Sequence, residues 1–374
     1  MTTSGSSPRF RKPPLSAIPL EIVSVADYKA FARARLDDNA WAYLSGGTAD
    51  EITLRANREA FDRLLLTTRV LGDFSGESGT RCTLFGRKLD YPILLAPVAY
   101  HKLAHDDGEL ATVLGATAAR AGFIVSTHSS VALEEIARAA QTPLWFQLYF
   151  KTDRSLTREL VQRAEAAGYG AVVVTVDAPV NTMRNREQRA QFHLPPGVEA
   201  ANLRELPPAA AHQINPSALC GGLMATAPTW KDIEWLRSIT KLPVIIKGIM
   251  SPDDALLAVQ HGAAGIVVSN HGGRSLDTAC ASINALPRIT DVIEGRLPVL
   301  FDGGIRRGTD ILKALALGAS AVLIGRPYIY GLAAAGAVGV AHVLNILRAE
   351  LEVAMALTGC PTLEKISRNV IWRE

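Results

Sequence analysis

Residues Ile266–Arg274 have the sequence IVVSNHGGR, in which an apolar run ends abruptly in polar residues. The β-branched run Ile266–Val268 indicates a buried strand. The imidazole of His271, two glycines and the cation of Arg274 follow it directly. This order is typical of an acid–base group beside an anion-binding group, although a turn that merely ends a strand would contain similar residues. Because the same pattern recurs along the chain, the first interpretation is favoured.

From Tyr91 onward, apolar runs of this kind alternate with helical segments. We predict eight strands, at Pro92–Ala96, Phe123–Ser126, Leu144–Tyr149, Ala171–Val176, Val244–Lys247, Ile266–Ser269, Val299–Phe301 and Ala321–Ile324. Each crossover helix returns the chain to the same end, so the strands are expected to pair in parallel. Eight such units predict an α/β fold, the closed (β/α)8 TIM barrel. A doubly wound open sheet is the alternative, but the glycine-rich dinucleotide fingerprint after its first strand is missing.

The segments around the strands have patterns of their own. We predict an N-terminal cap of three helices: one near 24–36, a short one that ends at 41–47, and one at 50–63. The segment Thr80–Tyr91 predicts a hairpin at the barrel floor. The last helix is expected at about Val340–Leu357, because Gly359 and Pro361 form a stop signal. The barrel helices are expected to begin at the capping residues Asp106, Ser130, Asp153, Thr229, Ser251, Ser282 and Thr309.

The repeating region is expected to form one domain. Residues 1–20 are rich in Ser and Pro and predict a disordered arm, whereas residues 21–374 predict a single barrel domain. After the fourth strand the repeat is interrupted at about 185–229 by a segment rich in Pro and Ala. An insertion of this length in a barrel is more often a lid or a binding loop than a second domain.

The composition excludes several classes of protein. With 39 basic and 36 acidic residues the formal charge is +3, and no charged block indicates nucleic-acid binding. No apolar run approaches the roughly 18 residues of a membrane helix. The four cysteines lack the spacing of a zinc site or a disulfide framework, which favours a reducing cytoplasm. His101 and His105 stand four apart, but no third ligand accompanies them, so no metal is predicted.

Polar residues gather at the carboxyl ends of the predicted strands, where TIM barrels hold their catalytic groups. Seven of the eight ends are polar or charged, although the strands themselves are apolar. The last two ends, 302–308 and 324–327, combine bare backbone N–H groups with arginines, which predicts a phosphate site. Glycines that only make tight turns are the alternative there. Together with Lys247 on the fifth strand, this pattern predicts a phosphorylated cofactor across the barrel mouth.

These motifs together resemble those of one family. VVSNHGGR, DGGIRRGTDILKALALGA, IGRP, WFQLY, TVDAP and IIKG are similar to motifs of the FMN-dependent L-2-hydroxy acid oxidases and dehydrogenases, which include glycolate oxidase, lactate oxidase, mandelate dehydrogenase and flavocytochrome b2. The resemblance extends from about Glu21 to Arg368. It implies a TIM barrel that binds FMN and assembles as a homotetramer or octamer.

The resemblance also implies a role for individual residues. His271 is the implied catalytic base, Asp177 orients it, and Tyr149 contacts the substrate hydroxyl. The substrate carboxylate is implied to be held by Arg274, Tyr43 and Arg184. The flavin ring and ribityl chain are implied to contact Ala96, Ala99, Ser126, Gln147, Thr175, Lys247 and Ser269. The ribityl and phosphate end of the cofactor is implied to contact Asp302, Gly304, Arg306, Gly325 and Arg326.

General chemistry agrees with these implied roles. Breaking an unactivated α C–H bond needs an electron sink and a base, which flavin and His271 would supply. A guanidinium suits a planar carboxylate better than an ammonium does, which favours Arg274 as the substrate anchor. Lys247 offers a point charge where a reduced flavin gathers negative charge.

The sequence departs from the family pattern around the expected substrate pocket. His128 occupies a position at which glycolate oxidases have Trp and other members Tyr or Leu, and Tyr100 adds an unusual aromatic ring. The usual basic pair before the insertion is reduced to Arg184. Glycolate therefore cannot be assumed as the substrate.

The implied activity is oxidation of an L-2-hydroxy acid to the 2-oxo acid, with reduced FMN reoxidised by O2 to give H2O2. A dehydrogenase that passes electrons to a quinone or a carrier protein is the alternative. A flavin-binding protein without catalysis would not need His271, Arg274, Tyr149 and Asp177 together. A type 2 isopentenyl diphosphate isomerase also binds FMN on a barrel, but the carboxylate-binding cluster does not suit a diphosphate.

Overall fold

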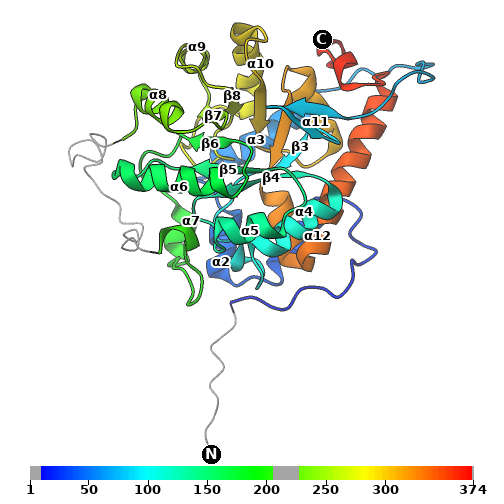
Figure 1. The fold of residues 1–374 in the computed structure, drawn as a ribbon. Coiled ribbons are helices and arrows are strands. Elements are labelled where there is room, and N and C mark those ends of the chain that lie inside the picture. Colours follow the sequence, from blue (N-terminus) through cyan, green and yellow to red (C-terminus); the bar gives the residue numbers. More distant parts are fainter. Residues whose placement is uncertain (1–9, 205–226, 373–374) are drawn as a thin grey trace, which may run out of the picture.

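The computed structural model describes residues 10–204 and 227–372, and its centre is a closed barrel of eight parallel strands (Figure 1). These are β3 (Ile93–Leu95), β4 (Gly122–Ser126), β5 (Leu144–Leu148), β6 (Val172–Thr175), β7 (Val244–Ile249), β8 (Gly265–Val268), β9 (Val299–Asp302) and β10 (Ala321–Ile324). Each strand pairs with the next along the chain, and β10 pairs with β3 to close the ring. The predicted TIM barrel is confirmed, and the predicted strand ends lie within two residues of the observed ones.

Side chains alternate between the two sides of the barrel wall. The interior is filled by one cluster, which includes Leu94, Ile124, Trp145, Val173, Ile245, Val267, Leu300 and Leu323. The residues between them belong to the larger cluster that packs the strands against the surrounding helices. The strands are buried on both faces, which explains why their sequences are continuous apolar runs.

The predicted hairpin closes one end of the barrel. β1 (Cys82–Leu84) and β2 (Arg87–Leu89) pair in antiparallel, and Leu84 and Leu89 belong to the interior cluster. At the turn, the ring of Phe85 meets Trp145 edge-on, with 5.3 Å between the ring centroids. The hairpin therefore forms the floor of the barrel, opposite the carboxyl ends of the strands.

The N-terminal helices form the predicted cap: α1 (Tyr28–Arg33), α2 (Asp38–Ser45) and α3 (Ile52–Arg63). The expectation of a disordered arm over 1–20 is wrong for its described part, residues 10–20. Arg11 forms a β-bridge with Leu36, and the backbone N–H of Leu15 donates to the carbonyl of Ala334 over 2.8 Å. Backbone hydrogen bonds thus hold this apparently featureless segment against α1 and α12. Residues 1–9 lie outside the described residues.

The barrel helices are α4 (Glu109–Ala119), α5 (Leu133–Ala139), α6 (Arg154–Ala166), α8 (Trp230–Ile239), α9 (Pro252–Gln260), α10 (Ser282–Ile293) and α11 (Gly308–Ala316). Asp153, Thr229 and Ser251 are N-caps, as predicted. The other four predicted caps are wrong: α4, α5, α10 and α11 have Gly108, Ala132, Ala281 and Arg307 there. Tertiary contacts engage two of the expected side chains elsewhere, because Asp106 pairs with Arg11 and Ser130 donates to Glu109.

The last helix, α12 (Arg326–Leu357), begins earlier than Val340. Non-helical backbone at Ala335 and Gly336 (φ +59°) separates two halves, and the expected helix corresponds to the second. The expectation that no apolar run approaches membrane length is also wrong, because α12 is long and apolar enough to cross a membrane by composition. Of its most apolar window, 67% is buried inside the protein. Packing against α1, α4 and α11 explains this composition.

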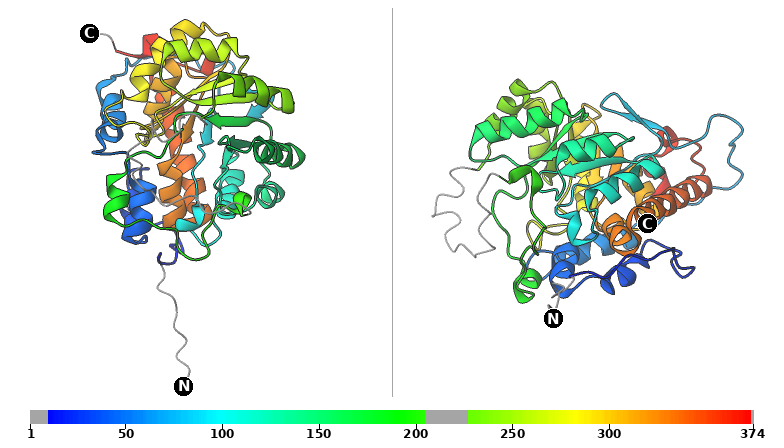
Figure 2. Two further views of the ribbon diagram at one scale, coloured as in Figure 1. Left: turned by 90° about the vertical axis from the view of Figure 1, so that its left-hand side faces the viewer. Right: turned by 60° about the horizontal axis from the view of Figure 1, so that its bottom comes forward.

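The insertion begins with ordered structure. α7 (Asn185–Arg189) packs against α2 of the cap, and Figure 2 shows the two helices at the same end of the barrel. A short 3-10 turn follows at Ala201–Leu203. The rest of the predicted lid, from 205 to 226, lies outside the described residues.

The buried hairpin predicts a specific stability effect. Leu84→Ala removes a side chain that is 3% exposed and leaves a cavity at the barrel floor. We expect a loss of about 2–5 kcal/mol in the free energy of unfolding, measured by denaturant titration. Thr83→Ala, on the exposed side of the same strand, is the matched control. Equal effects of the two substitutions would contradict the burial of this hairpin in the core.

Candidate active site

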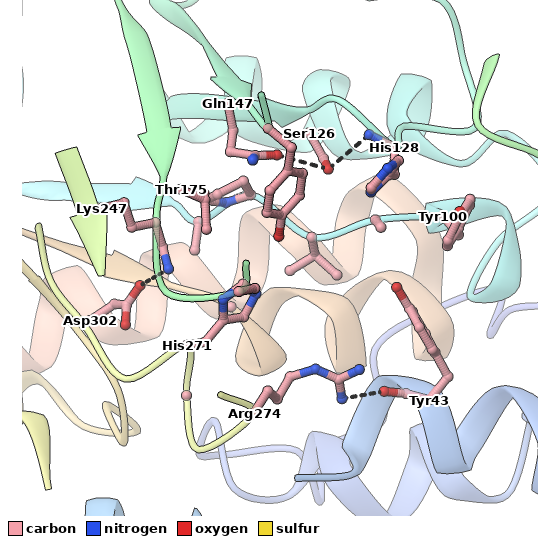
Figure 3. Close-up of a pocket in the computed structure, with 18 of the residues that line it drawn as sticks. Tyr43, Tyr100, Ser126, His128, Gln147, Thr175, Lys247, His271, Arg274 and Asp302 are labelled. Carbon is pink, nitrogen blue, oxygen red and sulfur yellow. Dashed lines mark hydrogen bonds and ion pairs between the residues drawn. The ribbon is translucent and has the colours of Figure 1, made fainter. Parts of the chain in front are cut away.

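A cavity of about 720 Å³ opens at the carboxyl ends of the strands, and all eight ends contribute to its lining. Its size is that of a cofactor or drug-sized ligand site. All predicted site residues except Asp177 and Ser269 line this cavity. Asp177 and Ser269 lie directly behind lining residues, because Asp177 forms a hydrogen bond with His271 and Ser269 forms one with Lys247. Figure 3 shows the polar side chains of these strand ends around a common space.

His271 and Asp177 form a largely buried pair beside this space. The Nδ1 atom of His271 lies 2.8 Å from Oδ1 of Asp177, which orients the ring and leaves Nε2 for a ligand. His271 has a left-handed backbone (φ +58°), and its N–H donates to the Ser269 hydroxyl. Position 248, which lies behind the pair, must be a glycine, because a Cβ there would lie 2.5 Å from Cβ of Asp177.

The electrostatics of this pair favour a neutral imidazole beside a carboxylate. Burial lowers the pKa of His271 below its ordinary value, and the charges of Lys247 and Arg274 lower it further. Burial raises the pKa of Asp177, but the attraction of His271 and Lys247 outweighs it, so the net direction is downward. His271 is thus set up to accept a proton, and Asp177 to stabilise the resulting cation.

A second buried network is centred on Lys247, which is 3% exposed. Its Nζ lies 3.2 Å from Oδ2 of Asp302 and 2.9 Å from the hydroxyl of Ser269, which donates to Asp302 over 2.6 Å. Burial lowers the pKa of Lys247, but the carboxylates of Asp302 and Asp177 outweigh it and raise the pKa overall. The cation is therefore kept at the cavity wall, as Figure 3 shows.

The arginine of the SNHGGR motif is held from several sides. Nη1 of Arg274 donates to the carbonyls of Tyr43 and Gly46, each over 2.8 Å, and Nη2 donates to Glu187 over 2.9 Å. Its guanidinium also lies 5.1 Å from the centroid of the Tyr43 ring. Burial, followed by repulsion from Arg184, lowers the pKa of Arg274 to about 10. It still carries its charge at neutral pH and presents it to the cavity.

The predicted phosphate end lies at the start of α12. Gly325 and Arg326 begin this helix, whose N-terminal N–H groups favour an anion. Arg306 also lines the cavity here. A Cβ at Gly325 would meet only Ala96 and Val98, at 3.9 Å, so the backbone is bare toward the cavity. At Gly304 (φ +87°) a Cβ would lie 2.2 Å from the carbonyl oxygen of Asn57, so glycine is required.

Two buried donors in this cavity have no hydrogen-bond partner among the described residues: Nε2 of Gln147 and Nε of Arg326. The carbonyl of the Gln147 amide is already engaged by the Ser126 hydroxyl and the Thr127 N–H, both at 3.2 Å. Buried donors without partners point to a missing acceptor-rich group. The donor set of Gln147, Lys247, Arg306 and Arg326 fits a flavin ring at one end and its phosphate at the other.

Aromatic rings form a further part of the cavity wall. His128 stacks between Tyr100 and Tyr149, with centroids 6.1 Å and 5.3 Å away, and Tyr43 stacks on Phe192 at 4.6 Å. Burial, together with the charge of Lys151, lowers the pKa of His128 to about 3, so its ring is neutral at physiological pH. This wall therefore presents flat, uncharged surfaces.

The prediction from sequence missed several residues of the site. Phe192 and Glu187 lie in the insertion that we expected to be a loop, although an acid three residues after Arg184 suits a helical ion pair. Asn57 and Asn270 exchange side-chain hydrogen bonds of 2.8 and 2.9 Å, which tie α3 to the loop of His271. No periodicity distinguishes such an amide pair from ordinary polar residues.

Two further histidines and one further arginine have structural partners outside the cavity. His101 bonds Thr112 within the core, and His342 bonds Tyr28. Arg307 pairs with Asp62 at the surface. Within 10–204 and 227–372, no group of three or more His, Cys, Asp or Glu residues is placed to hold a metal ion.

The chain is similar to known proteins along nearly its whole length. The family model described as FMN-dependent dehydrogenase matches residues 32–373. The L-lactate oxidase of Nostoc sp. is 47% identical over 357 residues, which cover 93% of this chain and 98% of the relative. The glycolate oxidase of Spinacia oleracea is 43% identical over a match that covers 94% of this chain and 96% of the relative. A crystal structure of mandelate oxidase superposes with a TM-score of 0.85 at 42% identity, covering 94% of this chain and 98% of that one.

The charge on Asp177 predicts the titration of His271. Asp177→Asn removes a negative charge that favours the imidazolium, so the pKa of His271 is expected to fall further below its ordinary value. NMR titration of protein labelled in its histidine rings measures this shift. The pKa of His342, which pairs with Tyr28 elsewhere, should stay unchanged. A His271 pKa that rises or does not move would contradict the assigned coupling.

Proposed function

The chain belongs to the FMN-dependent dehydrogenase family, and we propose that it acts as an oxidase of an L-2-hydroxy acid, using O2 and releasing H2O2 and the 2-oxo acid. It is an FMN-dependent oxidoreductase that acts on the CH–OH group of 2-hydroxy acids. The observation that carries the proposal is that His271, paired with Asp177 behind it, and Arg274 line the same cavity. This combination places a base and a carboxylate anchor beside a site that fits FMN.

The cofactor contributes an electron sink for the substrate's two electrons when it is bound. Gln147 would hold the polar edge of its ring and Lys247 would supply a positive charge there. Arg306, Gly325 and Arg326 would hold its phosphate at the N-terminus of α12. Gly304 keeps the backbone close to this end of the cavity, because the position does not admit a Cβ.

The protein's own residues bind and deprotonate the substrate. Arg274 has an Nε–H and a second Nη2–H without partners among the described residues, and these would donate to the substrate carboxylate. With that carboxylate held, the reacting carbon would face His271, which accepts a proton at Nε2. Asp177 stabilises the imidazolium that results. Tyr149 lines the same space, and burial raises its pKa, so its hydroxyl would donate to the substrate.

Electron transfer to O2 is supported by the relatives, which are named oxidases of lactate, glycolate and 2-hydroxy acids. A dehydrogenase would instead pass the electrons to a quinone or a carrier protein. The rate at which O2 reoxidises the reduced protein, compared with the rate for an artificial quinone, separates these two activities.

The substrate side chain would face the wall of Tyr43, Tyr100, His128, Tyr149 and Phe192. Flat, neutral rings favour an uncharged aliphatic or aromatic group over a charged one. The neutral state of His128 supports this, because its lowered pKa keeps a cation out of the wall. An uncharged side chain also suits lactate or mandelate, which relatives and structural neighbours are named for.

Assembly into a homotetramer or octamer is part of the proposal. Exposed apolar side chains gather where the loop after α3 meets the end of α12: Leu65, Val70, Leu71, Phe74, Val353 and Leu357. The segments adjoin, since the N–H of Arg69 donates to the carbonyl of Leu357 over 2.9 Å. A second copy of the chain is the partner that would cover such a patch in a symmetric assembly.

This patch predicts an effect on molecular mass. The double variant Leu71→Asp, Leu357→Asp places charges on two exposed positions of the patch. We expect light scattering to give a smaller assembly than the wild type, with unchanged circular dichroism. A monomeric wild type would contradict the proposed assembly.

The role of His271 gives a direct test of the catalytic proposal. His271→Gln removes the base but none of the donors expected to hold FMN, so the variant should purify yellow with a normal flavin content. Turnover should fall by about 10²–10⁴-fold, the usual contribution of a general base. The control is His128→Gln, a second histidine of the cavity wall, which lacks a carboxylate partner among the described residues and should lower kcat far less. Near-normal turnover of His271→Gln would overturn the assignment.

A further inference from the structure

Glu187 of α7 lies between the two arginines expected to hold the substrate carboxylate. Its side chain is 2% exposed, and one oxygen, Oε1, accepts from Nη1 of Arg184 over 3.2 Å and from Nη2 of Arg274 over 2.9 Å. Both arginines line the cavity, whereas Glu187 lies behind them. A single carboxylate oxygen is therefore shared by two largely buried guanidinium groups.

The three side chains form one charge cluster. Repulsion from Arg184 lowers the pKa of Arg274, and attraction from Glu187 acts in the opposite direction. Two like cations buried this close need a counter-charge, since an unpaired buried charge is costly. With Glu187 ionised, the cluster carries one net positive charge. Each further negative charge on a ligand is therefore attracted less strongly than it would be by the two arginines alone.

We propose that Glu187 sets this net charge and thereby makes the site selective for 2-hydroxy acids with a single carboxylate near the reacting carbon. The inference rests on the proposed function for the kind of anion that the site receives. Glu187 also positions Arg274, because its contact with Nη2 joins the carbonyls of Tyr43 and Gly46 on Nη1. Glu187 does not touch the reacting atoms, and it acts through the two arginines.

Residues other than Glu187 attach α7 to the cap. Arg186 on the same helix pairs with Glu51 and donates to the Ser45 hydroxyl over 2.9 Å. Glu51 therefore supplies a matched control. Glu51→Gln, like Glu187→Gln, replaces one carboxylate by an amide, but it leaves the pair of Arg184 and Arg274 with its counter-charge.

Oxamate and oxalate are suitable probes. They have nearly the same size and shape, but oxalate carries one more negative charge at neutral pH. Titration calorimetry of the FMN-loaded protein gives both dissociation constants without turnover. In Glu187→Gln the ratio of the oxamate to the oxalate dissociation constant should rise at least about tenfold, because a unit charge a few ångströms away acts on the extra carboxylate. In Glu51→Gln this ratio should stay at the wild-type value.

Two further variants keep the test decisive if Glu187→Gln does not fold. Arg184→Gln removes a positive charge, so the same ratio should fall below the wild-type value. Glu187→Asp keeps the charge and should keep the ratio, even if both ligands bind less tightly. Equal changes for oxamate and oxalate in Glu187→Gln, or shifts of the same sign in Glu187→Gln and Arg184→Gln, would overturn the proposal.

Failure of this inference is distinguishable from failure of the proposed function. A protein that binds both probes with the expected charge dependence but oxidises no 2-hydroxy acid would contradict the function alone. A protein that oxidises hydroxy acids with an unchanged ratio in Glu187→Gln would contradict the inference alone.

Discussion

Parallel pairing of β10 with β3 closes the barrel, and the arrangement of the site depends on this closure. In a closed ring of parallel strands every carboxyl end lies on one side. His271, Lys247 and Gln147 come from three different strand ends, yet they meet around one cavity. The apolar interior beneath them and the hairpin at the floor keep that ring rigid.

Each of the main basic side chains of the site is paired with a carboxylate. Asp177 faces His271, Asp302 faces Lys247, and Glu187 is shared by Arg184 and Arg274. Each of these basic side chains thus has a carboxylate partner, and all four line the cavity. Such an arrangement keeps ionised groups in a site of low dielectric without an excess of positive charge. It also allows the protein to discriminate between ligands by their net charge.

The sequence predicted those parts of the structure that follow from repeated local patterns. The eight strands were found because continuous β-branched runs are buried on both faces, and the polar strand ends followed from the barrel. Helix starts were less predictable, because tertiary contacts engage Asp106 and Ser130 elsewhere. The first half of α12 was missed since the backbone break at Gly336 splits its pattern. Glu187 and the Asn57–Asn270 pair depend on contacts between distant segments, which no single-sequence pattern encodes. The site roles expected from family resemblance remain predictions, although their side chains surround one cavity or lie directly behind it.

In our proposal, L-2-hydroxy acids are oxidised in this cavity through FMN. Anaerobic stopped-flow mixing with the L and D enantiomers of lactate and mandelate, followed at the flavin absorbance near 450 nm, tests it most directly. We expect rapid bleaching by an L enantiomer, slow or no bleaching by its D counterpart, and return of the absorbance when O2 is admitted. A yellow protein whose absorbance no 2-hydroxy acid bleaches would contradict it.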